Sequence, residues 1–275
     1  MVQITEIQLN NRKISNRDPA IMIAGMNVIE SEELCMSVAG ELVKICEKNN
    51  IDLIFKASFD KANRSSIASF RGPGVDQGLK ILKKVKDEFN VPIISDIHEP
   101  AQAETAGEIL DVIQIPAFLS RQTDLIRAAC ETKKVINIKK AQFLSPLQMM
   151  NIIEKCNHFG NQNILLCERG SIFGYDNLIV DFLGLDKIKK IAPTILDITH
   201  SLQIPGGKGT SADGRSSQAK VLGTAAAAIG LAGFFIEVHP SPENALCDGA
   251  SATRLSEFES LLLELKKFDE LSKAL

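Results

Sequence analysis

The sequence predicts an α/β protein, specifically a closed (β/α)8 TIM barrel of parallel strands with an N-terminal β-hairpin. The chain has 275 residues, close to the ~250 residues typical of one such barrel. Short apolar runs rich in β-branched residues alternate with longer segments of helical period along the whole chain. Open doubly wound sheets seldom repeat strand–helix units so evenly, so we expect the sheet to close.

The apolar runs give the expected elements of the barrel. Strands are expected at Ile21–Ala24, Leu53–Lys56, Pro92–Asp96, Val112–Ile115, Val135–Lys139, Ile164–Cys167, Ile195–Thr199 and Phe234–Val238. Helices are expected at Ser31–Asn49, Val75–Phe89, Gln122–Glu131, Pro146–Asn157 and Arg215–Leu231. Ser31, and Ser145 followed by Pro146, are typical helix starts.

The N-terminal segment carries a different pattern. Ile4–Ile14 is amphipathic, and Asn10-Asn11 is typical of a turn, so this segment is expected to form a hairpin under the barrel floor. We therefore expect a single domain over residues 1–275, in which 1–18 form the hairpin and 19–275 form the barrel.

Composition excludes several classes of protein. The chain is 45% hydrophobic and 24% charged, as in ordinary globular proteins. A net charge of −3 argues against nucleic-acid and membrane-surface partners. The longest apolar run, Ala225–Ile236, is too short to span a bilayer. The six cysteines have no metal-finger spacing and the N-terminus has no signal-peptide pattern, which indicates the reducing cytoplasm.

Polar residues gather at the C-terminal ends of the predicted strands. Because strand side chains alternate, residues two apart share a face. Such pairs are Lys56 and Ser58, Asp96 and His98, Asn137 and Lys139, Cys167 and Arg169, and Glu237 and His239, while Asn27, Gln114 and His200 end the remaining strands. A single polar strand end is common in solvated loops. The convergence of this many polar strand ends predicts an active site at the top of the barrel.

The segment Phe55–Ser66 is the densest in cations, amides and hydroxyls. Arginine offers a bidentate fork, lysine a point charge and serine a short donor, a mixture that favours phosphate recognition. The segment alone could also be a solvated basic loop. Lys139 and Arg169 arrive from other strands and favour the phosphate site. Cations that converge in a chain of net charge −3 indicate a ligand with several negative charges.

Among the four histidines, His158 lies in a polar helix-end context and is expected to be structural or solvent-facing. His98 and His239 end inward-pointing patterns, but each also precedes a helix start. Each is therefore either a site residue or part of a cap.

His200, Glu237 and Asp248 are ligand types that suit a divalent metal. The neighbour expected from the first strand is Asn27, a poor transition-metal ligand. Three residues thus favour metal use and the fourth opposes it.

A glycine-rich segment, Ile204–Gly214, follows the seventh strand. It has no P-loop consensus, and we interpret its glycines as those of a flexible lid. The later segment Gly223–Gly233 is rich in Ala and Gly and is expected to form a helix that packs tightly on the barrel.

Several motifs together resemble the 3-deoxy-D-manno-octulosonate 8-phosphate synthase family. They are Gly25–Ser31 (GMNVIES), Phe55–Ser66 (FKASFDKANRSS), Arg71–Gly74, Asp96–Pro100, Gln114–Leu119, Ile138–Phe143, Cys167–Gly170, Phe173–Leu178 and Cys247–Gly249. The resemblance implies a (β/α)8 barrel, usually in a homotetramer. It also implies condensation of phosphoenolpyruvate with D-arabinose 5-phosphate and water to give the octulosonate phosphate of lipopolysaccharide and inorganic phosphate.

The resemblance also implies roles for individual residues. Positions that hold phosphoenolpyruvate are Lys56, Ser58, Lys61, Gln114, Lys139, Gln142 and Arg169. Positions that hold the sugar phosphate are Asn63, Arg64, Ser65 and Asp96, with Arg121 reaching into a neighbouring subunit's site.

Asn27, His200, Glu237 and Asp248 match the four metal positions of the metal-dependent subclass, where the first is cysteine. Asn27 implies the metal-independent subclass, with no metal and no cofactor. The expected catalytic set is then Asn27, Lys61, His200, Glu237 and Asp248. One departure is Ala250, where the family commonly has proline.

The chemistry assigns provisional roles. As C3 of phosphoenolpyruvate attacks the aldehyde, a proton donor must meet the growing oxyanion and water must add at C2. We assign His200 and Lys61 to the donor side, and Asp248 and Glu237 to the placement of water.

Three alternatives stay open. The first is a heptulosonate 7-phosphate synthase that uses erythrose 4-phosphate, although it typically carries Lys-Pro-Arg-Thr where this chain has Lys61–Ser65. The second is a Schiff-base aldolase with Lys139 as its amine, since a neighbouring cation can depress a lysine pKa. The third is a non-catalytic sugar-phosphate-binding barrel, which fold alone does not exclude.

Overall fold

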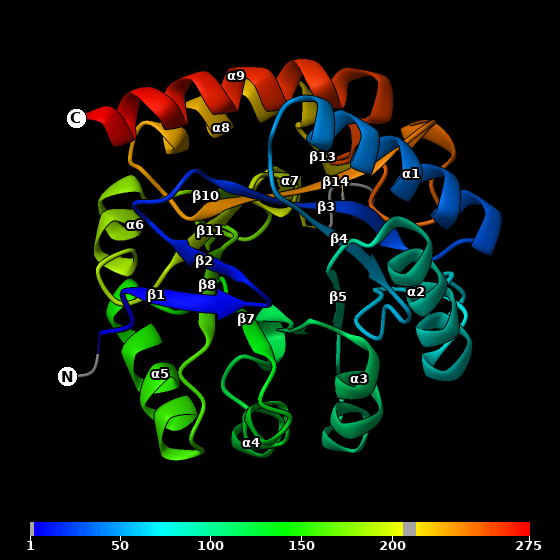
Figure 1. The fold of residues 1–275 in the computed structure, drawn as a ribbon, viewed down its shortest axis with the longest axis horizontal. Helices are drawn as coiled ribbons and strands as arrows, with labels where there is room; N and C mark the ends of the chain where they lie inside the picture. Colours follow the sequence, from blue (N-terminus) through cyan, green and yellow to red (C-terminus); the bar gives the residue numbers. More distant parts are fainter. Residues whose placement is uncertain (1–2, 206–212) are drawn as a thin grey trace.

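The structure, a computed structural model, describes residues 3–205 and 213–275. Within those residues, parallel strands close into a barrel, as the sequence predicted (Figure 1). They are β3 (Ile21–Val28), β4 (Leu53–Ser58), β5 (Ile93–Asp96), β6 (Val112–Ile115), β7 (Val135–Lys139), β8 (Ile164–Glu168), β11 (Thr194–Asp197) and β14 (Gly233–His239). Neighbours in this order pair in parallel, and the pairing of β14 with β3 completes the ring.

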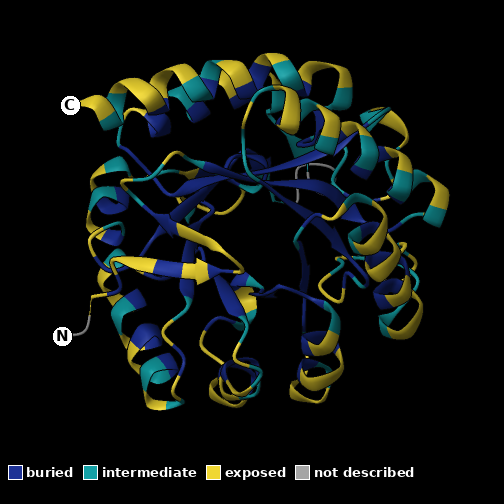
Figure 2. Cartoon of the chain, in the orientation of Figure 1, coloured by how far each residue is buried: buried dark blue, intermediate teal, exposed yellow. Residues whose placement is uncertain are grey.

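Helices cover the outside of the barrel and bury its strands (Figure 2). They are α1 (Glu32–Lys48), α2 (Val75–Phe89), α3 (Ala103–Ile109), α4 (Thr123–Glu131), α5 (Met149–His158), α6 (Phe182–Ile188), α7 (Ile198–Ser201), α8 (Ala219–Ala227) and α9 (Leu255–Ala274). The hydroxyl of Ser31 caps α1 by accepting from the backbone N–H of Leu34 at 3.1 Å. Along β4 every residue is buried, because one face meets the helices and the other fills the barrel.

Short 3₁₀ turns precede several helices and refine the predicted bounds. They are η1 (Pro100–Gln102), η2 (Ala117–Leu119), η3 (Pro146–Gln148), η4 (Ser216–Gln218) and η5 (Pro242–Asn244). The helix predicted from Pro146 therefore begins as η3, where Ser145 and Gln148 form a capping box. The helix predicted at Arg215–Leu231 is shorter at both ends, running through η4 and α8.

The first strand, β3, runs to Val28, well beyond its predicted end at Ala24. The opposite departure, which bears on the site, lies in the seventh unit. Its strand, β11, ends at Asp197, whereas the sequence predicted an end at Thr199. The carboxylate of Asp197 accepts from the backbone N–H of His200 at 2.8 Å and so starts the one-turn helix α7. This early turn changes which side chains meet at the end of the strand.

The N-terminal hairpin forms as expected. Strands β1 (Glu6–Leu9) and β2 (Arg12–Ser15) pair antiparallel, and Asn10 has a φ of 52°, as such a turn requires. The backbone N–H of Ile4 donates to Ile191 O at 2.9 Å, which fixes the hairpin beside the N-terminal end of the barrel (Figure 1).

Small ladders lie beyond the barrel strands. β9 (Ser171–Ile172) pairs with β10 (Leu178–Ile179), β12 (Gln203–Ile204) with β13 (Asp213–Gly214), and β15 (Thr253–Arg254) with the end of β14. The predicted lid, Ile204–Gly214, lies mostly outside the described residues, because 206–212 are not among them. Within the described part of the chain, no helix is long and apolar enough to cross a membrane. All six cysteines are buried free thiols.

Candidate active site

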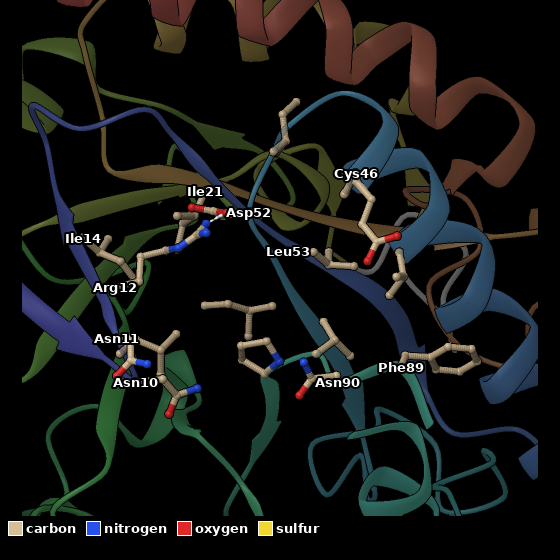
Figure 3. A pocket seen from close by; sticks show the side chains of 17 residues that line it. Asn10, Asn11, Arg12, Ile14, Ile21, Cys46, Asp52, Leu53, Phe89 and Asn90 are labelled. Atoms are coloured by element: carbon tan, nitrogen blue, oxygen red, sulfur yellow. Dashed lines mark ion pairs between the residues drawn. The ribbon is translucent and has the colours of Figure 1, made fainter. Parts of the chain in front are cut away.

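Cavities lie at both ends of the barrel. One of about 420 Å³ lies at the N-terminal end, between the hairpin, α1 and the start of β4. There Arg12 points toward Asp52, and Leu53 and Phe89 supply apolar surface (Figure 3). Another, of about 190 Å³, lies at the C-terminal ends of the strands. Active sites of this fold occupy the C-terminal end, which points to the smaller cavity.

The smaller cavity brings together most of the predicted site residues. Its wall contains Lys61, Asn63, Arg64, Ser65, Asp96, Gln114, Lys139, Gln142, Arg169, His200 and Asp248. Lys56, Ser58, Asn27 and Glu237 are buried beside these residues and contact them or one another, but they do not line the cavity. Arg121 is exposed and does not line the cavity of its own chain.

Lys56 lies in a second layer behind the cavity wall. Its Nζ donates to Met26 O at 3.2 Å, to Asn27 O at 2.8 Å and to Glu237 Oε1 at 2.5 Å. Burial lowers the pKa of Lys56 to about 8, although the charge of Glu237 opposes this effect. Since all three donors are engaged within the protein, Lys56 supports the wall electrostatically.

Asp96 connects the second layer to the wall. Its carboxylate accepts from Ser58 Oγ at 2.8 Å and from Gln114 Nε2, and it faces Lys61 Nζ at 3.5 Å. Burial opposes ionisation, but the charges of Lys61 and Lys56 hold the pKa of Asp96 well below its ordinary value. Burial likewise opposes protonation of Lys61, but Asp96 and Glu237 raise its pKa above the usual range. Both groups are therefore charged at neutral pH.

Asp197 is a site residue that the sequence reasoning missed. Its carboxylate contacts Lys139 Nζ and lies 2.7 Å from His200 Nδ1. Burial opposes ionisation, but His200 and Lys139 hold the pKa of Asp197 well below its ordinary value. Strand alternation pairs His200 with position 198, whereas the helical turn of α7 brings residues three apart together. The i, i+3 spacing of Asp197 and His200 at a predicted strand end is the feature of the sequence that could have identified Asp197.

His200, Glu237 and Asp248 meet at one side of the cavity. His200 Nε2 lies 3.5 Å from Glu237 Oε2 and 4.0 Å from Asp248 Oδ2, and one ligand atom from each residue fits within a 4.8 Å cluster. Burial opposes ionisation of Glu237, but His200 and Lys56 lower its pKa to about 2. These three groups alone offer a partial coordination set for a divalent ion.

Asn27 does not complete that coordination set. Its Nδ2 donates to Glu237 Oε2 at 2.5 Å and to Asp248 Oδ2 at 3.1 Å. Rotating the amide would turn its oxygen toward two carboxylates, so the donor orientation is the stable one. The amide thus presents hydrogens to the carboxylates that a metal would require as ligands. A four-ligand transition-metal site does not fit these residues.

Arg169 presents a guanidinium to the cavity. Its Nη2 donates to Gln203 Oε1 at 2.8 Å, and Gln203 also lines the cavity, a residue that the sequence reasoning missed. Nη1 is buried without a partner among the described residues, and so is Gln142 Oε1. Burial lowers the pKa of Arg169, which stays a cation at neutral pH. Buried unpaired donors and acceptors in a cavity wall indicate a polar ligand.

Arg64 reaches from the β4–α2 loop to the loop after β14. Its guanidinium contacts Cys247 Sγ, and lies 3.5 Å from Leu246 O and 3.9 Å from Asp248 Oδ1. Burial raises the pKa of Cys247 to about 12, so this thiol is neutral. Arg64 therefore adjoins the cluster of His200, Glu237 and Asp248, and Asn63 and Ser65 line the same cavity.

The other histidines lie outside the cavity wall. The backbone N–H of His98 donates to Gln102 Oε1 at 2.7 Å, so His98 belongs to a helix start. His239 Nδ1 accepts from the backbone of Ser241 at 3.0 Å, and its Nε2 lies 3.5 Å from Glu30. His158 packs edge-on against Phe159 at the end of α5.

Comparison with known proteins agrees with this geometry. The chain matches the DAHP synthetase I family over residues 3–274. It is 53% identical over 268 residues to the 2-dehydro-3-deoxyphosphooctonate aldolase of Pseudoalteromonas translucida, covering 98% of this chain and 94% of the relative. It is 53% identical over 269 residues to that of Psychromonas ingrahamii (98% and 96%), and 52% identical over 274 residues to that of Shewanella amazonensis (99% and 97%).

Proposed function

Because the chain belongs to the 2-dehydro-3-deoxyphosphooctonate aldolases of the DAHP synthetase I family, we propose that it condenses phosphoenolpyruvate with D-arabinose 5-phosphate and water. The products are 3-deoxy-D-manno-octulosonate 8-phosphate, for lipopolysaccharide, and inorganic phosphate. The observation that carries this proposal is the meeting of Lys61, Lys139 and Arg169 in one cavity wall. Cations at or just beyond the ends of three separate strands suit a small ligand with several negative charges.

The cations bind and orient phosphoenolpyruvate. Lys61, Lys139 and Arg169 neutralise its carboxylate and phosphate, while Gln142 offers an unpaired amide oxygen. Its C3 then faces the aldehyde carbon of the sugar phosphate. Holding two reactants in a reactive geometry contributes on the order of 7–11 kcal/mol in favourable cases. This orientation is the main contribution of these residues.

The bond changes define the remaining tasks. The C3–C1 bond forms, the aldehyde oxygen takes a proton, and water adds to C2 with loss of a proton. The new hydroxyl on C2 then loses its proton as the C2–oxygen bond breaks, the phosphate leaves with the electron pair of that bond, and a ketone remains. His200 donates a proton to the aldehyde oxygen from Nε2, because Asp197 holds its Nδ1 at 2.7 Å and so fixes the ring. Lys61 stabilises the oxyanion, and Glu237 and Asp248 hold the water.

We assign the metal-independent form of this reaction to the chain. Asn27 supports the assignment, because its amide bridges Glu237 and Asp248 through two hydrogen bonds. Lys56 binds the other oxygen of Glu237 at 2.5 Å. The amide of Asn27 and the ammonium of Lys56 thus bind the carboxylates that a metal ion would otherwise bind. Every step above uses only protein groups.

Substrate preference depends on the sugar-phosphate side of the cavity. Asn63, Arg64 and Ser65 offer an amide, a guanidinium and a hydroxyl to the phosphate of a five-carbon sugar. The test is phosphate release from phosphoenolpyruvate with arabinose 5-phosphate and, separately, with erythrose 4-phosphate. We expect strong preference for arabinose 5-phosphate. Equal or better turnover with erythrose 4-phosphate would contradict the proposal and favour a heptulosonate synthase.

The contacts of Lys139 argue against a Schiff-base mechanism. Its Nζ binds Asp197 and lies 3.6 Å from the centroid of the Phe235 ring, contacts that stabilise a positive charge. A Schiff base requires the neutral amine. Borohydride trapping with pyruvate is expected to leave Lys139 unmodified.

Tight ligand binding without any turnover would instead favour the non-catalytic alternative.

We also propose a cytoplasmic homotetramer in which Arg121 completes a neighbouring site. The free thiols support a reducing compartment. Arg121 is exposed in the β6–α4 segment, where Phe118 is 56% exposed. In the following β7–α5 segment, Phe143 and Leu147 are 58% and 61% exposed. Exposed apolar surface of this kind favours association. Arg121→Ala should weaken sugar-phosphate binding without changing the mass measured by light scattering. A monomeric wild type would contradict this assembly.

A further inference from the structure

We propose that Lys140 and Glu168 are positioning residues that hold the phosphoenolpyruvate-binding residues Gln142 and Arg169 at their working separation. This inference rests on the proposed function. Lys140 and Glu168 are 1% and 2% exposed, and neither lines the cavity. They lie directly behind two loops that do line it.

Lys140 is a buried cation whose acceptors come from two loops. It follows the last residue of β7, and its side chain points away from the side occupied by Lys139. Its Nζ lies 3.3 Å from Ala141 O and 3.2 Å from Leu144 O in the β7–α5 loop. On the other loop it donates to Ser171 Oγ at 3.0 Å.

Glu168 binds Lys140 and the backbone of the loop that follows β8. Its Oε2 lies 3.5 Å from Lys140 Nζ, and its Oε1 accepts from the backbone N–H groups of Arg169 at 2.9 Å and Gly170 at 2.7 Å. The carboxylate therefore fixes the peptide that carries the Arg169 side chain. Gly170 has a φ of 90°, a conformation that glycine adopts readily.

Backbone contacts close the connection between the loops. The N–H of Ile172 donates to Gln142 O at 3.1 Å, and the N–H of Lys140 donates to Cys167 O at 2.8 Å. The ion pair sits between these two contacts. Displacing one loop would therefore displace the other, and with it the distance between Gln142 and Arg169.

Loss of one member leaves the other as an uncompensated buried charge, which burial strongly disfavours. The loops must then separate or admit water. A shift of about 1 Å at a binding group can cost on the order of 100-fold in rate. The sugar-phosphate residues Asn63, Arg64 and Ser65 lie on the β4–α2 loop and contact neither Lys140 nor Glu168. The effect should therefore fall on phosphoenolpyruvate.

The test compares Lys140→Met with Lys273→Met. Lys273 is a matched control, since its side chain is 10% exposed and pairs with Asp269 at 2.7 Å on α9, away from the cavity. We expect Lys140→Met to raise the KM of phosphoenolpyruvate about tenfold or more and that of arabinose 5-phosphate by less than about twofold. Lys273→Met should lower the melting temperature and leave both KM values unchanged. Equal changes in both KM values for Lys140→Met would overturn the proposal.

A milder variant covers the case in which Lys140→Met fails to fold. Ser171→Ala removes one acceptor of Lys140 and leaves the ion pair in place. It should raise the KM of phosphoenolpyruvate about twofold to tenfold. Unchanged kinetics in this variant, beside an unfolded Lys140→Met, would mean that the pair serves stability alone.

Hydrogen exchange tests the ordering of the two loops independently of the proposed catalytic activity. Lys140→Met, or Ser171→Ala in its place, should speed amide exchange in both 141–144 and 168–172, whereas Lys273→Met should not. A wild type that releases no phosphate would refute the proposed function, and the exchange result would still decide whether the pair orders the loops. Faster exchange in one loop only, or equal exchange in the site variant and the control, would overturn the inference.

Discussion

Replacement of Arg169 by lysine separates charge from geometry at the centre of the site. Arg169 is 6% exposed, its Nη2 binds Gln203 at 2.8 Å, and its Nη1 is an unpaired donor in the cavity wall. Lysine retains the charge but cannot hold Gln203 and clamp a ligand through a planar fork. At least one charge-assisted hydrogen bond is lost, at about 1.5–3 kcal/mol. Arg169→Lys should therefore lower kcat/KM for phosphoenolpyruvate roughly 10- to 150-fold.

The assay is the initial rate of phosphate release with each substrate varied in turn. Arg127→Lys is the matched control, because Arg127 is 52% exposed and pairs with Asp124 on the surface of α4. It should leave both kinetic constants unchanged. Near-normal kcat/KM for phosphoenolpyruvate in Arg169→Lys would refute the clamp and would show that only net charge matters there.

Three further predictions follow from the same site. Arg64→Ala should raise the KM of arabinose 5-phosphate about tenfold or more, and that of phosphoenolpyruvate much less, in the same assay; similar effects on both would place Arg64 elsewhere. Exhaustive chelation should leave wild-type activity unchanged, whereas Asn27→Cys should bind one equivalent of zinc by elemental analysis; activity lost in chelator and restored by metal would reverse this reading. The depressed pKa of Asp96 means that its stabilising contribution is present above its ordinary pKa of ~3.9 and is lost as pH falls further. Asp96→Asn should therefore cost about 1–3 kcal/mol in urea unfolding at pH 7. The difference should shrink below pH ~4, and a constant difference would argue against ionised Asp96.

The barrel was predictable because its strands are buried on both faces and read as short apolar runs. Val112–Ile115 and Val135–Lys139 have the predicted bounds. Errors arose where a side chain ended an element, as Asp197 does by capping α7. Apolar periodicity carries no information about such a cap. Helix α9, the longest helix among the described residues, packs against α8 and was not predicted.

The gathering of the candidate residues around one cavity was predictable, but their division into a cavity wall and a layer behind it was not. Strand alternation placed Asp96, Lys139 and Arg169 together correctly, because their strands run straight to the cavity. It could not separate Lys56, whose side chain lies one layer behind the cavity wall with its donors engaged. Strand alternation also could not find Gln203. This residue follows α7, and the turn of the chain there brings its side chain to Arg169.

The amide of Asn27 bears on how such enzymes change over evolutionary time. The codons of asparagine and cysteine cannot be exchanged by a single base change, and serine is one intermediate between them. An Asn27→Ser intermediate would have one hydroxyl donor for two carboxylates, those of Glu237 and Asp248, where the amide now supplies both hydrogen bonds. It would also lack the thiolate that draws in a soft metal. An exchange of asparagine for cysteine through serine is therefore expected to pass through a less active form, which would favour persistence of the residue already present.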